Sequence, residues 1–230
     1  MSKVGLTFDD ITLAPAYSEI RTRSEVRLGS VLGTERPLCL RLPIISAPMD
    51  TVSSPALAAR LSDAGGICIL HRYMSIADQV AQVYQAFELA EDKERFQIGA
   101  AVGATGDYEM RTAALVHAGV KAICVDVAHG HHVAVKECLQ TLRRTYPGLH
   151  IMAGNIATAE AYRDLVDWGA DSLRVSIGSG SCCETRVNTG HGLPALYSVM
   201  DVLANGTPKK FGFLKQEPKA GIILDGGVRN

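Results

Sequence analysis

The chain has 230 residues, of which 47% are hydrophobic and 20% are charged, so it is long and apolar enough to bury a globular core. Its 23 basic residues nearly balance its 24 acidic ones, which argues against nucleic acid or an anionic membrane as a partner held mainly by charge. The apolar runs are shorter than a membrane span, and the first residues lack the hydrophobic core of a signal peptide. We therefore expect a soluble cytoplasmic protein that binds no nucleic acid and no membrane.

The six cysteines show none of the paired spacings of a zinc site, and four of them lie in or beside apolar segments. Reduced thiols are the expectation. The histidines at positions 71, 129, 131 and 132 invite a metal site, but those in the loop lack helical ligand spacing. The sequence does not favour a histidine metal centre.

Short apolar runs alternate with amphipathic segments along the chain. After an extended arm at residues 5–15, which we expect to cap a core, strands are predicted at 43–50, 67–70, 96–102, 120–127, 150–153, 172–177 and 220–224. Helices are predicted between them, with capping residues or glycines at their ends, at 55–63, 76–90, 107–118, 133–146, 158–168 and from 195 to about 205. Residues 209–219 are polar and interrupted by proline, which predicts a surface excursion.

Strict alternation of strands and helices implies a parallel sheet with right-handed crossovers. Polar and reactive residues collect where the predicted strands end, at Met49, Asp50, His71, Asp126, Asn155, Cys183 and Asp225. This pattern is typical of an α/β TIM (β/α)₈ barrel, whose functional groups lie at the carboxyl ends of the strands. Seven units are one short of the full barrel, so we expect the eighth strand to lie outside residues 1–230. An open doubly wound sheet is the alternative.

Residues 177–186 form the stretch around which the chain is organised. They follow a predicted buried strand, and two glycines flank Ser179. Such a turn lets backbone N–H groups converge on an anion such as phosphate, and cysteines follow immediately. The pattern therefore combines an anion cradle with a nucleophile. The alternative is a structural turn followed by cysteines that pack as small hydrophobes.

Seven segments, in chain order, resemble the IMP dehydrogenase and GMP reductase family. They are residues 5–10, 46–52, 99–103, 126–130, 153–155, 178–183 and 225–227. The resemblance covers nearly the whole chain. It implies a TIM barrel, usually a homotetramer, that transfers a hydride between C2 of a purine nucleoside monophosphate and a nicotinamide cofactor. It also implies one catalytic domain over residues 1–230. Many members carry an inserted CBS regulatory module at the position that corresponds to residues 71–96. Here a single helix-length link spans that position, so the module is absent.

The resemblance assigns roles within the cysteine loop. Cys183, and not Cys182, corresponds to the nucleophile that attacks C2, which must be a thiolate able to leave again. Thr185 corresponds to a threonine that helps to activate water or the leaving group. The backbone carbonyls of Gly178, Gly180 and Cys183 correspond to a potassium site, because hard oxygen ligands suit that ion.

Five residues correspond to contacts with the nucleotide. Ser181 matches a residue that contacts the phosphate, and Gly226 and Gly227 let the phosphate approach backbone N–H groups. Asp225 matches the carboxylate that accepts hydrogen bonds from the ribose hydroxyls. Met49 corresponds to a further contact with the nucleotide.

Three residues correspond to the cofactor side. Asp126 and Asn155 match positions that line the site of NAD, or of NADP in a reductase, where a carboxylate can bind the nicotinamide ribose. Without the resemblance, both could simply cap the helices that follow them. Ser176 stands where the family has a glycine, close to where the nicotinamide would stack. The mobile flap that carries the remaining catalytic residues corresponds to positions after Asn230.

These observations favour an IMP dehydrogenase, which oxidises IMP to XMP with NAD through a covalent thioimidate on Cys183, in guanine nucleotide biosynthesis. The choice of a dehydrogenase over a reductase rests on residues 99–103, residues 126–131 and the amino-terminal arm, which look more like dehydrogenase segments. The absent inserted module favours the alternative, a GMP reductase that converts GMP and NADPH to IMP and ammonia. A hypothesis of another class is a non-catalytic subunit for purine-nucleotide binding or assembly, suggested by the absent flap and by Ser176.

Overall fold

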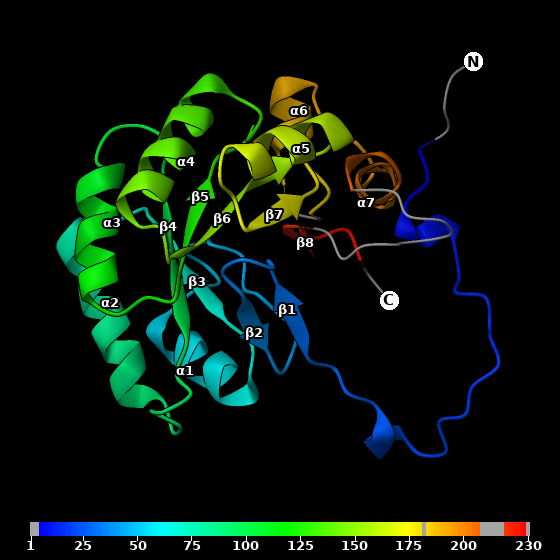
Figure 1. The fold of residues 1–230 in the computed structure, drawn as a ribbon, viewed down its shortest axis with the longest axis horizontal. Coiled ribbons are helices and arrows are strands. Elements are labelled where there is room, and N and C mark those ends of the chain that lie inside the picture. Colours follow the sequence, from blue (N-terminus) through cyan, green and yellow to red (C-terminus); the bar gives the residue numbers. More distant parts are fainter. Residues whose placement is uncertain (1–4, 181–182, 208–218, 229–230) are drawn as a thin grey trace.

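The structure, a computed structural model, describes residues 5–180, 183–207 and 219–228. Its centre is a six-stranded parallel sheet in which neighbouring strands are also consecutive in the chain (Figure 1). The strands are β3 (Cys68–Leu70), β4 (Ile98–Val102), β5 (Ala122–Asp126), β6 (His150–Ile156), β7 (Ser172–Val175) and β8 (Gly221–Leu224). Each connection steps one strand in the same direction, as in a (β/α) barrel. The fold is a partial TIM barrel, which confirms the predicted fold class.

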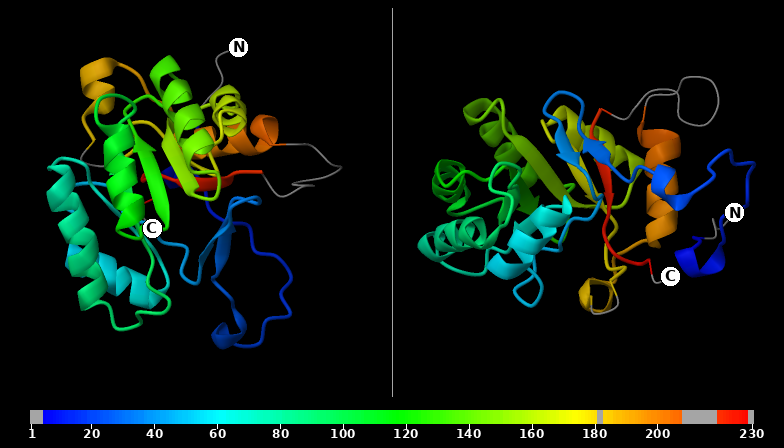
Figure 2. Two further views of the ribbon diagram at one scale, coloured as in Figure 1. Left: turned by 60° about the vertical axis from the view of Figure 1, so that its left-hand side comes forward. Right: turned by 90° about the horizontal axis from the view of Figure 1, so that it is seen from below.

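Five helices alternate with these strands and cover the outer face of the sheet (Figures 1 and 2). They are α1 (Pro55–Ala64), α2 (Ile76–Leu89), α3 (Tyr108–His117), α4 (Val133–Thr145) and α5 (Ala159–Asp167). Ser54, Ser75 and Thr158 cap α1, α2 and α5, because each side-chain oxygen accepts a backbone N–H of the first turn. Two shorter helices follow the cysteine loop, α6 (Thr185–Thr189) and α7 (Ala195–Asp201).

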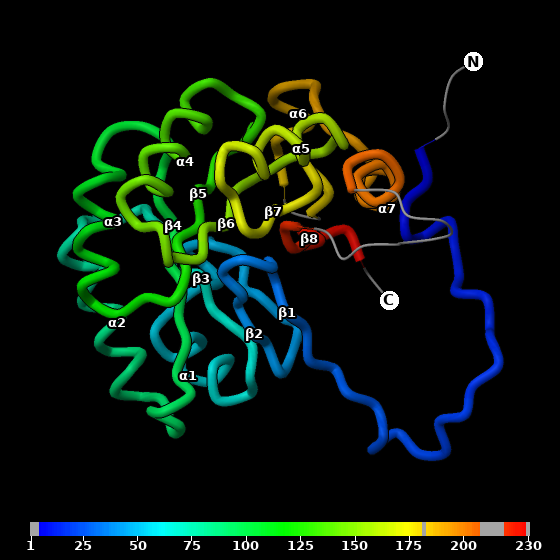
Figure 3. Tube along the Cα trace, viewed as in Figure 1, coloured from blue at the N-terminus to red at the C-terminus, as the bar shows by residue number. Residues whose placement is uncertain are grey.

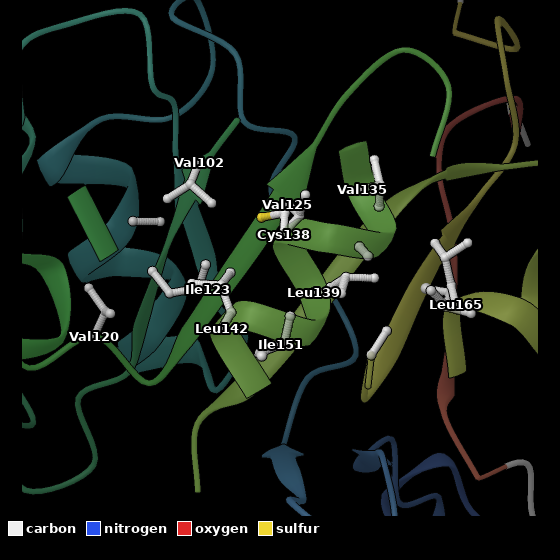
Figure 4. Close-up of a cluster of buried hydrophobic side chains, with 14 of the residues drawn as sticks. Val102, Val120, Ile123, Val125, Val135, Cys138, Leu139, Leu142, Ile151 and Leu165 are labelled. Atoms are coloured by element: carbon white, nitrogen blue, oxygen red, sulfur yellow. The ribbon is translucent and has the colours of Figure 1, made fainter. Parts of the chain in front are cut away.

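The main core lies between the sheet and the helices. Helix α4 contributes Cys138, Leu139 and Leu142, which recur at helical spacing and are fully or almost fully buried. Figure 4 shows this stripe beside Ile123 of β5 and Ile151 of β6. This core packs the helices against the outer face of the sheet. The carboxyl ends of the strands remain open for a site.

An antiparallel hairpin covers the amino ends of the strands. It consists of β1 (Ser30–Leu32) and β2 (Leu38–Leu40), and the sequence analysis did not predict it. Leu32, Leu38 and Leu40 pack against the side chains inside the barrel, in a cluster with Ile67, Ile69, Ala101, Ala122, Cys124 and Met152. The hairpin therefore closes the bottom of the barrel opposite the cleft.

The predicted strand at residues 43–50 is reduced to a single parallel bridge between Ile45 and Ile67. The count of seven parallel strands was therefore wrong as stated: within the described residues, the parallel sheet has six strands and one added bridge. Pro43 and Pro48 explain the difference, since neither has a backbone N–H to donate to a ladder. The predicted helix from 195 to about 205 also changes character, because α7 ends at Asp201 and continues as the π-helix Val202–Gly206. Most of the predicted excursion at 209–219 lies outside the described residues.

The amino-terminal arm runs outside the sheet, on the side of β8 and α7 (Figure 3). It forms two 3₁₀ turns, η1 (Phe8–Asp10) and η2 (Arg23–Glu25). Gly5 approaches Pro194, and residues 5, 7 and 8 are half-buried, whereas residues 9–29 are exposed. The first residues of the arm therefore contact the rest of the chain, but none of its described residues belongs to either core cluster, so the expectation that the arm caps a core was wrong.

Candidate active site

A cleft of about 650 Å³ opens at the carboxyl ends of the strands. The residues predicted from the sequence that line it are Met49, Asp126, Asn155, Ser176, Gly178, Gly180, Cys183, Thr185, Asp225 and Gly226. Gly227 lines a neighbouring pocket of about 270 Å³ that shares residues 178–180 with the cleft. Ser181 and Cys182 lie outside the described residues. Apart from these two, the predicted residues come together from distant parts of the chain at one end of the sheet.

Asp225 stands at the centre of the polar network of the cleft. Its backbone N–H donates to the carbonyl of Val175 at 3.0 Å, which extends the strand ladder one residue beyond β8. Its Oδ1 lies 3.0 Å from Nη2 of Arg174, and its Oδ2 accepts a hydrogen bond from Nδ2 of Asn155. Each carboxylate oxygen has more than one lone pair, so Asp225 is held in place and can still accept from a ligand hydroxyl.

Arg174 is a site residue that the sequence analysis missed. It lies within β7 and is 5% exposed, yet it lines the cleft. Burial lowers its pKa, but Cys124, Asp225 and Asp126 outweigh that effect, so the pKa of the guanidinium lies above its usual value. Arg174 is therefore a permanent positive charge inside the barrel.

Asp126, at the end of β5, has a raised pKa, because burial penalises its charged form. The positive charge of Arg174 opposes this shift, the negative charge of Asp225 adds to it, and Arg72 opposes it more weakly. The alternative that Asp126 and Asn155 cap helices is wrong, since His132 and Thr158 are the capping residues of α4 and α5. Both residues line the cleft, and neither side chain is used as a helix cap.

Cys183 is exposed and opens on the cleft. Its backbone N–H donates to the carbonyl of Gly180 at 3.1 Å, and its Sγ donates to Oγ1 of Thr185 at 3.2 Å. The alternative that this cysteine packs as a small hydrophobe does not apply to Cys183. The structure pairs a solvent-accessible thiol with a hydroxyl, which is the arrangement that a nucleophile with a neighbouring proton carrier requires.

Arg186, also missed from the sequence, anchors the cysteine loop. Its Nε donates to the carbonyl of Ile177 at 3.2 Å, and its Nη2 donates to the carbonyl of Leu193. Ile177 and Leu193 also form an antiparallel bridge. One side chain therefore ties together the two ends of the segment that carries Cys183.

The turn after Asp225 requires its two glycines. Gly226 and Gly227 have φ angles of +73° and +81°, a region that favours glycine. A Cβ at Gly227 would also come within 3.0 Å of Cβ of Ser179. The two glycines therefore let the turn after β8 pack closely against the cysteine loop.

Ser176 follows β7 and is almost fully buried, with a φ of +131°. Its backbone N–H donates to the carbonyl of Ile156 at 2.8 Å, and its carbonyl accepts from Nδ2 of Asn155 at 2.8 Å. Its hydroxyl donates to Oγ of Ser179, a residue that the sequence analysis gave no role beyond the loop. Only the serine in place of glycine marked this position in the sequence.

The cleft holds polar atoms of the kind that a nicotinamide cofactor and a monovalent cation would bind. Nε and Nη1 of Arg174 are buried and have no acceptor among the described residues, so a polar ligand group in the cleft would satisfy them. The carbonyl of Gly180 accepts one hydrogen bond and keeps a second lone pair, as a hard oxygen ligand must. Within the described residues, no group of three or more His, Cys, Asp and Glu side chains is arranged to hold a metal ion.

The histidine cluster has a different environment. Nε2 of His131 lies 2.8 Å from Oδ2 of Asp164, and its ring lies 5.7 Å from that of Trp168. The side chain of His132 caps α4. These contacts join the loop after β5 to α5 and give these two histidines structural partners.

The fold and the cleft define an α/β-barrel protein with a cysteine loop and a carboxylate at the carboxyl ends of neighbouring strands. The family model for the IMP dehydrogenase / GMP reductase domain matches residues 5–230. The chain belongs to this family.

Three relatives show the extent of the similarity, and each is named inosine-5'-monophosphate dehydrogenase. That of Borreliella burgdorferi is 33% identical over 276 residues, which cover 100% of this chain and 65% of the relative. That of Cryptosporidium parvum is 33% identical, with 98% and 62% covered. That of Nitrosopumilus maritimus is 28% identical, with 99% and 70% covered. The chain thus spans about two thirds of the length of these relatives.

None of the helices in the described part of the chain has the length and apolar character needed to cross a membrane.

Proposed function

We propose that the complete protein is an IMP dehydrogenase, which oxidises IMP to XMP with NAD. The observation that carries this proposal is that Cys183, Thr185 and Asp225 open on one cleft at the carboxyl ends of the strands. The names of the relatives support the choice of dehydrogenase.

The nucleotide would be held at both ends. Asp225, fixed by Arg174 and Asn155, would accept hydrogen bonds from the ribose hydroxyls. The backbone N–H groups of Gly226 and Gly227 would bind the phosphate. Ser181 would contact the same phosphate, and Met49 would contact the nucleotide from the loop after Ile45. These contacts would set C2 of the purine beside the thiol of Cys183.

The reaction would proceed in two stages. The thiolate of Cys183 attacks C2, forming a C–S bond, and C2 then loses its hydrogen with the bonding pair to give a thioimidate. A water molecule next adds to C2, and the C–S bond breaks to release XMP and the thiolate. Thr185, already hydrogen-bonded to Cys183, would move protons during the hydrolysis.

A bound NAD supplies the acceptor for the hydride. Asp126 would bind the hydroxyls of the nicotinamide ribose, Asn155 would line the same side, and Ser176 would lie beneath the ring. The carbonyls of Gly178, Gly180 and Cys183 would hold a potassium ion, which would stiffen the loop around the nucleophile. We further propose that residues 1–230 form one domain without an inserted module between 71 and 96, and that the protein is a homotetramer.

The complete protein should be assayed with IMP plus NAD and, separately, with GMP plus NADPH. We expect NADH and XMP in the first assay and no turnover in the second. Turnover of GMP alone would identify a GMP reductase. Calorimetric titration that finds nucleotide binding without turnover in either assay would favour a binding or assembly subunit.

A further inference from the structure

Ser176 occupies a backbone conformation that its side chain does not favour. Its φ of +131° makes it the one residue other than glycine with a positive φ among the described residues. Such conformations persist where surrounding contacts determine them, and they occur often at functional sites. The contacts of Ser176 therefore hold it in a conformation that its side chain alone would not favour.

The hydroxyl of Ser176 begins a chain of two hydrogen bonds. It donates to Oγ of Ser179 in the cysteine loop, and Oγ of Ser179 donates to the backbone carbonyl of Asp225 at 2.9 Å. Both hydroxyls have their hydrogen in use, so the two bonds run in one direction. The chain joins the end of β7, the cysteine loop and the turn after β8.

The backbone of Ser176 belongs to the same network. Its N–H bonds to Ile156 and its carbonyl accepts from Asn155, whose amide also donates to the carboxylate of Asp225. The residue is therefore fixed on the strand side, while its hydroxyl reaches the loop. A fixed base is what a side chain needs in order to position a mobile neighbour.

We propose that Ser176 is a positioning residue, which acts through Ser179 to hold the cysteine loop in register with Asp225. The relay would set the distance between the nucleophile on the loop and the ribose contact on the neighbouring strand. The inference rests on the proposed function, because it gives the relay the task of aligning Cys183 with a bound nucleotide. A glycine at position 176 would relax the backbone but lose this alignment.

Three single variants of the complete protein, the double variant Ser176→Ala/Ser179→Ala and one control separate the effect of the relay from that of the strained backbone. Ser176→Ala removes the hydroxyl and keeps the Cβ, whereas Ser176→Gly removes both. Ser179→Ala breaks the relay at a less buried residue and carries the test if a variant at position 176 does not fold. The matched control is Ser198→Ala, because the hydroxyl of Ser198 is buried in α7 and has no partner among the described residues.

Three quantities should be measured: the melting temperature, the dissociation constant of IMP, and the rate at which iodoacetamide alkylates Cys183, followed by peptide mass spectrometry. The loss of one hydrogen bond should weaken IMP binding about threefold to tenfold in each relay variant, and the double alanine variant should bind no more weakly than either single variant. Ser176→Gly should weaken binding in the same way while its melting temperature stays equal or rises. If Ser176 had a purely structural role, IMP affinity and melting temperature would fall together in this variant.

Alkylation of Cys183 without nucleotide tests the relay independently of the proposed function. We expect it to be at least about twofold faster in the relay variants, because each loses a hydrogen bond that holds the loop, and unchanged in Ser198→Ala. Unchanged alkylation and unchanged IMP binding in both Ser176→Ala and Ser179→Ala would overturn the relay. If the unmodified protein binds no IMP, the proposed function fails, and the alkylation rates still decide whether the relay holds the loop.

Discussion

Arg174 places a guanidinium inside the barrel, and one carboxylate of the cleft depends on it. We predict that Arg174→Met lowers the free energy of unfolding by about 2–4 kcal/mol, since it leaves Asp225 without its ion-pair partner in a partly exposed site. Arg95→Met is the control, because Arg95 pairs with Asp92 at 3.8 Å on the surface. That change should cost less than about 1 kcal/mol. Equal losses in urea unfolding would contradict the structural role of Arg174.

Asp126 should make the stability of the folded protein depend on pH. Its pKa in the folded protein is raised above 3.8 by burial, so the folded state binds more protons than the unfolded state in the interval above 3.8. Stability therefore falls as the pH rises through that interval, and the charged carboxylate costs stability at neutral pH. Asp126→Asn should raise the free energy of unfolding at neutral pH, with an advantage that disappears toward acid.

The same substitution should weaken the binding of NAD, because an amide accepts fewer hydrogen bonds from ribose than a carboxylate does. In the unmodified protein, NAD affinity should fall with decreasing pH earlier than for a carboxylate with an ordinary pKa. Urea unfolding and NAD titration at several pH values check both effects. Glu137→Gln, at an exposed position of α4, is the control and should change neither by much. A stabilised variant with full NAD affinity would remove Asp126 from the cofactor site.

The sequence identified the site residues that lie within recognisable motifs, but not the residues that hold those site residues in place. Cys183 and Asp225 lie in recognisable segments, and the structure brings them to one cleft. Arg174 was hidden in an apolar run, because a strand buried on both faces shows no alternation that would mark one side chain as unusual. Ser179 was hidden for a different reason: its partner, the carbonyl of Asp225, is 46 residues away and leaves no trace in side-chain identity.

Among the helices and strands, the hairpin β1–β2 should contribute measurably to the free energy of unfolding. Leu40 is 4% exposed and belongs to the cluster inside the barrel. We predict that Leu40→Ala lowers the free energy of unfolding by about 2–5 kcal/mol, through lost burial and the cavity that remains. Leu13→Ala removes the same atoms from a residue that is 92% exposed, so it should change stability by less than about 0.5 kcal/mol. Comparable losses would show that the hairpin does not close the barrel.

The helices were predictable because their signals are local. Ser75 caps α2 one residue before the amphipathic pattern begins, and Thr158 does the same for α5. The hairpin was not predictable, since each of its strands has three residues and its stability comes from contacts with strands far along the chain. Strand β6 extends to Ile156 for a similar reason: the pairing with β7 overrides the turn signal of Gly154 and Asn155.

At the scale of the whole molecule, the arm exposes large apolar side chains. Leu13 and Tyr17 are each at least 90% exposed, and Ile20 is 57% exposed. Association between copies would remove such surface from water. We predict that light scattering of the complete protein gives the mass of four copies. A monomer at the concentrations used for assay would contradict the proposed homotetramer.

The proposed mechanism depends on which of the two neighbouring thiols attacks the purine. The complete protein should be incubated with a purine nucleotide that carries a halogen at C2, digested, and analysed by peptide mass spectrometry. We predict a covalent adduct on Cys183, none on Cys182, and protection by IMP. Cys183→Ala should abolish both the adduct and turnover while nucleotide binding persists, and Cys182→Ala should retain turnover. An adduct on Cys182, or normal turnover by Cys183→Ala, would contradict the assignment of the nucleophile and the site built around it.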